Sequence, residues 1–232
     1  MTTRGKKYKT AATSLGEHKK MSAQEAIGEL KKVAYAKFDE TVSVDVNLGI
    51  DAGKSDQSVR GSVMYPHGTG KKVRVIVFAK DTYAHDAEKA GADIVGAEDL
   101  IEKIQGGWLE FDNAVATPDM MGAVGKLAKL LGPRGLLPNK RVGTVTFEVG
   151  AIVNELKKGK TFFKNDRTGL IHVLIGKKSF DDQQLLDNFS ALMKSVVSSR
   201  PAAAKGRFVK KVSISSTMGP GIEVAVDETF KV

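Results

Sequence analysis

The sequence predicts an α/β protein of two domains, one of them discontinuous in the chain. Apolar and polar residues alternate strictly near both ends, which is typical of antiparallel strands with one exposed face. The middle instead repeats an apolar strand followed by a helix, the pattern of a parallel sheet. We therefore predict a discontinuous α+β domain with an antiparallel sheet over residues 1–67 and 160–232, and an inserted, Rossmann-like α/β domain over residues 68–159.

The N-terminal part predicts a helix followed by antiparallel strands. Ser22 and Glu25 have the spacing of a capping box, and apolar residues then recur at helical spacing to about Ala36. Residues 41–50 alternate strictly, and residues 59–65 are expected to form their partner strand across a polar connection.

The inserted segment contains three strand and helix pairs. Its first strand is almost entirely apolar, as expected of a strand that is covered on both faces. The expected strands cover residues 73–79, 92–96 and 113–116. The expected helices cover residues 83–90, a stretch around 100–104 and a stretch from Thr117, as a cap, to Leu131. A strand over 144–149 and a helix over 152–158 are expected to lead back to the first domain.

The C-terminal part returns to alternation. A strand is expected over residues 170–175, a helix over 185–197 and a hairpin over 212–226 with its turn at 219–221. The outward side of the hairpin carries Ser213, Ser215 and Thr217. These hydroxyls, with no acid or imidazole among them, favour a docking surface over a catalytic one. An edge hairpin whose serines are merely solvated explains the same spacing equally well.

The charge of the chain favours a polyanionic partner, because Lys and Arg neutralise phosphates and release counterions. The formal net charge is +9 with a pI near 9.5. Residues 1–67 and 161–232 hold 22 Lys and Arg against 15 Asp and Glu, whereas residues 68–160 hold 14 against 12. The excess therefore belongs to the discontinuous domain, and residues 1–9 are expected to form a basic arm.

Composition and motifs give little support to an enzyme. The chain has no cysteine, which excludes disulfides and thiolate metal sites and suits a reducing cytoplasm, and it has no apolar run long enough to span a membrane. Gly49–Ser55 resembles a phosphate-binding loop but has three residues between its glycines, where four are needed. His18, His67, His85 and His172 lack metal-ligand spacing. We expect no catalytic residue, no cofactor and no metal. The alternative, a nucleotide-dependent enzyme that uses the inserted domain, rests on the strand and helix alternation alone.

Six blocks in order carry a resemblance to a known family. They are Lys37–Thr41, Ser55–Gly61, Ala116–Gly122, Leu131–Asn139, Asn165–Gly169 and Ser216–Pro220. Together they resemble the bacterial form of the first large-subunit ribosomal protein family, whose place is the mobile stalk beside the tRNA exit site. The resemblance covers essentially the whole chain. It implies a discontinuous antiparallel domain with an inserted three-layer domain.

The resemblance also implies partners. These are large-subunit rRNA in the stalk region, tRNA at the exit site, the mRNA of its own operon, and other parts of the large ribosomal subunit. Its implied roles are help in the release of deacylated tRNA and repression of its own operon. It implies a cytoplasmic, ribosome-bound protein that is a monomer off the ribosome and has no membrane partner.

Carried over to this chain, the resemblance implies an RNA surface on the discontinuous domain. Lys37 is expected at a phosphate, Phe38 against a ribose or base face, and Thr41 at a 2'-hydroxyl or phosphate. For Phe38, a core aromatic under the helix end is the alternative reading. The further expected contacts are Asp166, Arg167, Thr168, Gly169, His172, Ser213, Ser215, Thr217, Met218 and Gly219.

Two features of the inserted domain complete the expectations. Arg134, Lys140 and Arg141 are expected to make a secondary contact with RNA or tRNA, with a flexible basic loop as the equal alternative. The crossings between the domains at Gly68 to Gly70 and at Gly159 predict a hinge.

Overall fold

The computed structural model describes residues 4–16 and 20–225, so Val226 of the expected hairpin and His18 lie outside the described residues. The chain divides into two compact units, one made of residues 1–70 and 161–232 and the other of residues 71–160. The first unit contains an antiparallel sheet and the second a parallel sheet, so the predicted α/β fold class is confirmed. None of the described helices has the length and apolar character needed to cross a membrane.

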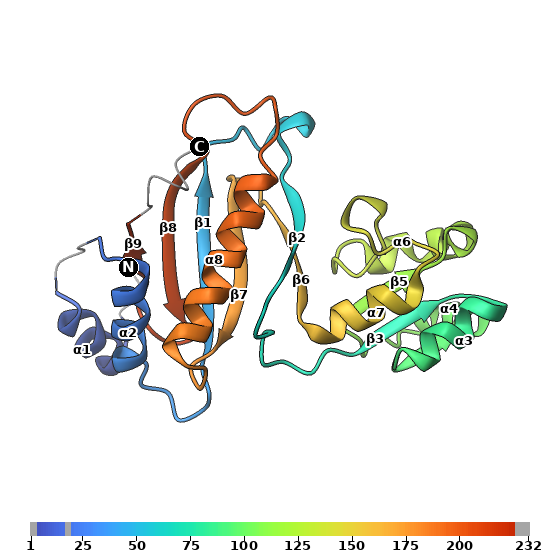
Figure 1. Cartoon of the computed structure of the whole chain (residues 1–232), viewed down its shortest axis with the longest axis horizontal. Coiled ribbons are helices and arrows are strands. Elements are labelled where there is room, and N and C mark those ends of the chain that lie inside the picture. The colour runs from blue at the N-terminus through green and yellow to red at the C-terminus, as the bar shows by residue number, and fades with distance from the viewer. Residues whose placement is uncertain (1–3, 17–19, 226–232) are drawn as a thin grey trace. The chain divides into compact units, whose positions relative to one another are not determined.

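The first unit is built on a four-stranded antiparallel sheet in the order β7-β1-β8-β9 (Figure 1). Its strands are β1 (Thr41–Leu48), β7 (Leu170–Lys177), β8 (Val209–Ser216) and β9 (Ile222–Val224). Its helices are α1 (Lys6–Ser14), α2 (Ala23–Val33) and α8 (Asp182–Ser198). Helices α2 and α8 pack together against one side of this sheet. Val42, Val44 and Val46 of β1 are fully buried in the core, whereas the alternate residues of β1 are partly exposed.

The expected strand over 59–65 exists but has a different partner. It is β2 (Arg60–Met64), which pairs with β6 (Lys160–Lys164) in a separate two-stranded sheet. The predicted pairing with the strand at 41–50 was therefore wrong. That strand, β1, lies between β7 and β8, both of which come from the far end of the sequence.

A β-bulge sits where β1 meets the end of β7. Val42 pairs with Gly176 and Ser43 with Leu174, so Ile175 has no partner residue on β1. Asn188 of α8, fully buried, donates from Nδ2 to the carbonyls of Ile175 (2.7 Å) and Gly68 (2.9 Å). Its Oδ1 accepts from the backbone N–H of His67 (3.3 Å). This one side-chain amide thus hydrogen-bonds the carbonyl of the bulged residue and holds the backbone of residues 67–68, where the chain begins to cross to the second unit.

The second unit has a three-stranded parallel sheet in the order β4-β3-β5. Its strands are β3 (Val75–Phe78), β4 (Ile94–Gly96) and β5 (Asn113–Ala116). Its helices are α3 (Asp81–Lys89), α4 (Glu98–Gln105), α5 (Met121–Val124), α6 (Ala128–Leu131) and α7 (Val149–Lys158), with short 3-10 turns at Pro118–Met120, Gly125–Leu127 and Lys140–Val142. All four residues of β3 are buried, as the apolar run predicts.

Two expectations for this unit were wrong in detail. The single helix expected from Thr117 to Leu131 is broken into short α and 3-10 segments. The Thr117 hydroxyl donates to the Phe78 carbonyl (3.5 Å) and does not cap the helix. The strand expected over 144–149 is reduced to one bridge between Val145 and Ala116.

Candidate RNA-binding surface

The side of the four-stranded sheet away from α2 and α8 carries polar residues in register. We call it the open face. It is formed by Thr41, Ser43, Asp45 and Asn47 of β1, His172 and Leu174 of β7, and Lys211, Ser213 and Ser215 of β8. Asp45 lies opposite His172 on one side and Ser213 on the other, and Ser43 opposite Leu174 and Ser215. The sheet therefore brings residues more than a hundred positions apart into adjacent rows.

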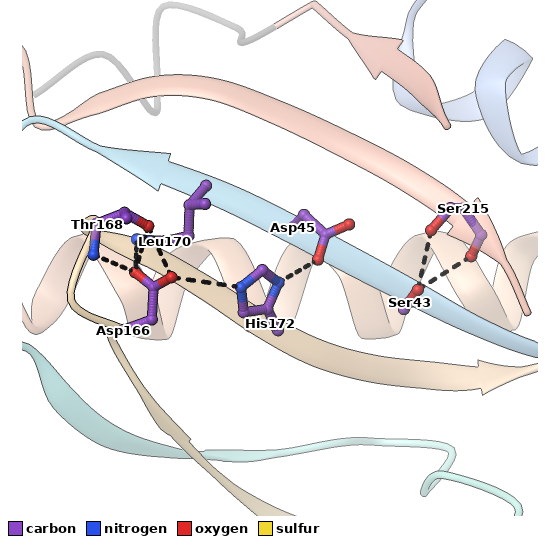
Figure 2. Close-up of polar contacts among 7 residues, drawn as sticks. All are labelled: Ser43, Asp45, Asp166, Thr168, Leu170, His172 and Ser215. Atoms are coloured by element: carbon purple, nitrogen blue, oxygen red, sulfur yellow. Dashed lines mark hydrogen bonds and ion pairs between the residues drawn. The ribbon is translucent and has the colours of Figure 1, made fainter. Parts of the chain in front are cut away.

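The open face does carry an acid and an imidazole beside the hairpin serines. His172 Nδ1 lies 2.6 Å from Asp45 Oδ1, and its Nε2 lies 3.9 Å from Asp166 Oδ2 (Figure 2). All three side chains are partly exposed. The imidazole thus bridges two carboxylates. His172 was expected from the resemblance, but Asp45 was missed.

The turn before β7 is ordered by Asp166. Its Oδ1 accepts from the backbone N–H groups of Thr168 and Leu170 (2.8 Å each), and both oxygens accept from the Thr168 hydroxyl (2.8 and 2.7 Å; Figure 2). These bonds, the Thr168 hydroxyl foremost, hold the pKa of Asp166 below its ordinary value. Gly169 follows with φ +83°, a conformation that favours glycine. Arg167 is exposed and makes no hydrogen bond or ion pair with any described residue.

Hydroxyls line the middle and far end of the open face. Ser43 Oγ and Ser215 Oγ are 3.0 Å apart, and Ser43 Oγ also donates to the Ser215 carbonyl (3.3 Å; Figure 2). At the start of β1, the Thr217 hydroxyl accepts from the Thr41 N–H (2.9 Å) and donates to the Thr41 carbonyl (3.3 Å). The Thr41 hydroxyl accepts from Lys177 Nζ (2.7 Å). The two threonine hydroxyls thus join strands as well as lining the surface.

Beyond Thr41, two loops meet at what we call the tip, formed by residues 34–40 and 216–219. Lys37 and Phe38 are exposed there, and Phe38 exposes 54% of its surface, so the alternative of a core aromatic was wrong. Met218 is 48% exposed, and its carbonyl accepts from the Tyr35 hydroxyl (2.9 Å). The tip therefore presents a cation and two apolar side chains to solvent.

Glu40, the last residue of the first loop of the tip, is fully buried. Its carboxylate accepts from the backbone N–H groups of Ala36 (2.7 Å) and Met218 (3.1 Å). Burial acts to raise the pKa of Glu40, but hydrogen bonds from Ser216, Ala36 and Met218 and the nearby Lys178 ammonium outweigh it and leave that pKa lowered. Sequence reasoning missed this residue, because an acid beside Asp39 in a polar loop gives no sign of burial.

Gly219 is a glycine for a reason internal to the tip. A Cβ at this position would lie 2.5 Å from Ser216 Oγ, closer than side chains pack. The Ser216 hydroxyl is one of the donors to Glu40. Gly221, in contrast, has no atom within 4 Å of its would-be Cβ.

The secondary candidates lie in the other unit. Arg134 is exposed in the turn after α6, and Lys140 and Arg141 are exposed in the 3-10 turn that Asn139 caps by accepting from the Arg141 N–H (2.8 Å). No contact among these three cations is found. Within the described part of the chain, no group of three or more His, Asp or Glu is placed to hold a metal ion.

The structure thus assembles the first set of candidates into one surface. Lys37, Phe38, Thr217, Met218 and Gly219 lie at the tip, Thr41 at the adjoining start of β1, Ser213 and Ser215 along β8, and Asp166, Arg167, Thr168, Gly169 and His172 toward the opposite end of β1. With about 3.4 Å per residue, the seven paired residues from Thr41 to Asn47 span roughly 20 Å. The sequence does contain a signal for Ser43 and Asp45, because they alternate with the buried valines of β1 and must therefore face the exposed side of the sheet.

A comparison with family models finds one match. The model described as "Ribosomal protein L1p/L10e family" matches residues 30–220, which include β1, the whole second unit, β7, α8, β8 and both loops of the tip.

Proposed function

Because the chain belongs to the ribosomal protein L1p/L10e family, we propose that the open face and the tip are its rRNA-binding surface. As a member of this family, the protein is a constituent of the large ribosomal subunit and binds rRNA, which makes it a ribosome-bound protein of the cytoplasm. The family is one of structural RNA-binding proteins. We further propose that the RNA is the stalk region of the large-subunit rRNA.

The observation that carries the proposal is that the thirteen expected contacts lie along one sheet, either on its open face or in the loops at the two ends of β1. Lys37 and Arg167 are exposed at opposite ends of this surface and are free to meet phosphates. Phe38 and Met218 offer apolar surface at the tip for a ribose or a base. The surface therefore offers phosphate contacts at its ends and hydroxyls between them.

The carboxylates of this surface determine which groups of the RNA can contact it. A phosphate cannot approach Asp45 and Asp166 closely, because like charges repel. These oxygens can instead accept hydrogen bonds from 2'-hydroxyls or base amino groups. We expect the RNA to present sugars and base edges to the middle of the open face, with its phosphates directed to Lys37 and Arg167.

Other roles belong to the same proposal. Binding of tRNA at the exit site, help in releasing deacylated tRNA, and repression of the protein's own operon through its mRNA are proposed from the family resemblance. Arg134, Lys140 and Arg141 are proposed as a separate contact for RNA or tRNA, because all three are exposed cations of one loop. The protein is expected to be a monomer off the ribosome.

The test is a binding titration with a stalk-region rRNA fragment, the DNA of the same sequence and a generic RNA duplex over a series of salt concentrations. A preference for the stalk RNA that persists at high salt supports the proposal, because phosphate contacts alone fade with salt. Equal binding to all three that fades with salt would refute it.

A pair of variants then places the binding on this surface. Thr217→Val removes the hydroxyl at the tip, and we expect it to weaken binding of the stalk RNA while the protein remains folded. Thr82→Val makes the same change at an exposed position of α3 in the other unit and serves as the control. Unchanged affinity in Thr217→Val would count against the tip as part of the site.

A further inference from the structure

The buried carboxylate of Glu40 connects two loops that are far apart in the sequence. One carboxylate oxygen accepts from the N–H of Ala36, which precedes Lys37 and Phe38. The other accepts from the N–H of Met218, which lies 178 positions after Glu40 in the chain. The backbone carbonyl of Glu40 accepts from the Lys178 N–H (2.8 Å) at the end of β7. One residue thus holds both halves of the tip and anchors them to the sheet.

The surroundings of Glu40 keep it charged and fully bonded. The Ser216 hydroxyl donates to the carboxylate. The nearby Lys178 ammonium donates to the Ala34 carbonyl (2.7 Å), so Lys178 also fixes the start of the loop of residues 34–40. A buried carboxylate is strongly unfavourable unless it is hydrogen-bonded and accompanied by a positive charge. Here both conditions are met, and the polar contacts form one network across the tip.

Besides Glu40, Asp39 fixes the first loop of the tip, because its carboxylate accepts from the backbone N–H (3.1 Å) and the hydroxyl (2.9 Å) of Ser179, but it makes no hydrogen bond to residues 216–219. The most prominent side chains of the tip, Phe38 and Met218, point to solvent and add little packing between the loops. Among the described residues, the other hydrogen bonds that join residues 35–41 to residues 217–218 are those of Thr41 with Thr217 and of Tyr35 with Met218. A loop that is not held in place must be ordered when its partner binds, which lowers affinity.

We infer that Glu40 is a positioning residue, which holds Phe38 and the Met218–Gly219 backbone in the arrangement that binds RNA without itself touching the RNA. This inference rests on the proposed function of the tip. Being wholly buried, Glu40 is inaccessible to a ligand, so its effect on binding is transmitted through the loops.

The experiment compares Glu40→Gln with Glu29→Gln in stalk-RNA binding and in amide hydrogen exchange of the free and RNA-bound protein. Glutamine keeps the shape but turns an NH₂ group toward one of the two backbone N–H donors, so at least one bond is lost. Glu29 lies on α2, where it pairs with Lys32, and its substitution makes the same change of net charge. Ser216→Ala is the second variant, since it removes one donor to the carboxylate and leaves the charge unchanged.

We expect Glu40→Gln to bind the stalk RNA about tenfold more weakly than Glu29→Gln, which corresponds to about 1.4 kcal/mol. The slope of log affinity against log salt should stay the same, because no phosphate contact is lost. The amides of Ala36 and Met218 should exchange faster in the free variant and recover with saturating RNA, while exchange in α8 and β1 changes much less. Ser216→Ala should show the same changes more weakly.

Three results would overturn the inference. The first is wild-type affinity in Glu40→Gln despite faster exchange at the tip. The second is exchange that becomes faster by the same factor throughout the first unit as at the tip, which would mean that Glu40 acts only through overall stability. The third is a changed salt slope, which would mean that a phosphate contact depends on it. Failure of the proposed function looks different, because wild-type protein would then show no preference for the stalk RNA.

Discussion

Replacing Asn188 with leucine tests how far one buried amide holds the discontinuous unit together. The change removes three hydrogen bonds, to Ile175 O, Gly68 O and His67 N, while keeping the branched shape and the number of non-hydrogen side-chain atoms. The Ile175 carbonyl is buried at the bulge, and leaving a buried group unsatisfied costs about 1–3 kcal/mol. The other two groups are partly buried and should each cost about 0.5–1 kcal/mol. The expected total is a loss of about 2–5 kcal/mol in the free energy of unfolding.

The assay is urea unfolding followed by two probes. Far-UV circular dichroism reports both units, whereas the fluorescence of Trp108, the one tryptophan of the chain, reports the unit of residues 71–160. We expect the circular dichroism transition to gain an early phase and the Trp108 transition to stay in place. Asn154→Leu, at an exposed position of α7, is the matched control and should change stability by less than about 0.5 kcal/mol. A cost below about 1 kcal/mol for Asn188→Leu would refute the reasoning, because it would show that the three groups find other partners.

Three further predictions follow from the same structure. Gly219→Ala, whose Cβ would meet Ser216 Oγ at 2.5 Å, should weaken stalk-RNA binding by about tenfold in a filter-binding assay, while Gly221→Ala, which meets no atom within 4 Å, should not. The pKa of Glu40 is lowered in the folded state from its reference value of 4.5, so the stability that its charge gives is complete above that value and is lost as the pH falls through the folded pKa. Urea midpoints measured at decreasing pH should show this loss in the wild type and a smaller loss in Glu40→Gln. The glycines at 68, 70 and 159, all with positive φ, are predicted to form a hinge, and fluorescence transfer between labels on the two units should change when RNA binds; an unchanged efficiency would contradict it.

The sequence was sufficient to predict which residues face inward but not which strands are neighbours. Alternation in β1 and β8 marks their buried sides, because a strand has only two faces. The pattern of residues 59–65 is equally clear, yet it carries no information about the strand that will pair with it. Its pairing with β6 depends on where the chain returns after the second unit, which is a tertiary property.

The second unit shows the limits of local patterns. The helix expected from Thr117 has correct apolar spacing, but Gly122 and Gly125 lie within it, and glycine is the poorest helix former after proline. The chain there forms short α and 3-10 turns that still bury Val124, Leu127 and Leu131. At 144–149, Thr144 is engaged with Asn139 through its hydroxyl and backbone, which leaves a single bridge where a strand was expected.

The candidate surface could be listed from the family resemblance, but its chemistry could not. The hydroxyls of β8 are visible in the sequence, whereas the pairing of His172 with Asp45 exists only once β7 and β1 are neighbours. Glu40 is a stronger case, because the sequence shows an ordinary acid in a polar loop. Its burial results from the approach of residues 216–218, which no local pattern indicates.

The position of β1 between two strands from the other end of the chain affects the order in which the two units can fold during synthesis. A ribosome synthesises β1 early, but neither of its neighbours, β7 and β8, exists until residues 170–177 and 209–216 have followed. The parallel sheet of the second unit has all its strands within residues 75–116 and is complete long before. Domains fold as units during synthesis, so the second unit is able to fold before β7 and β8, the partner strands of β1, have been synthesised. The open face is therefore assembled after the second unit, once residues 209–216 have been synthesised.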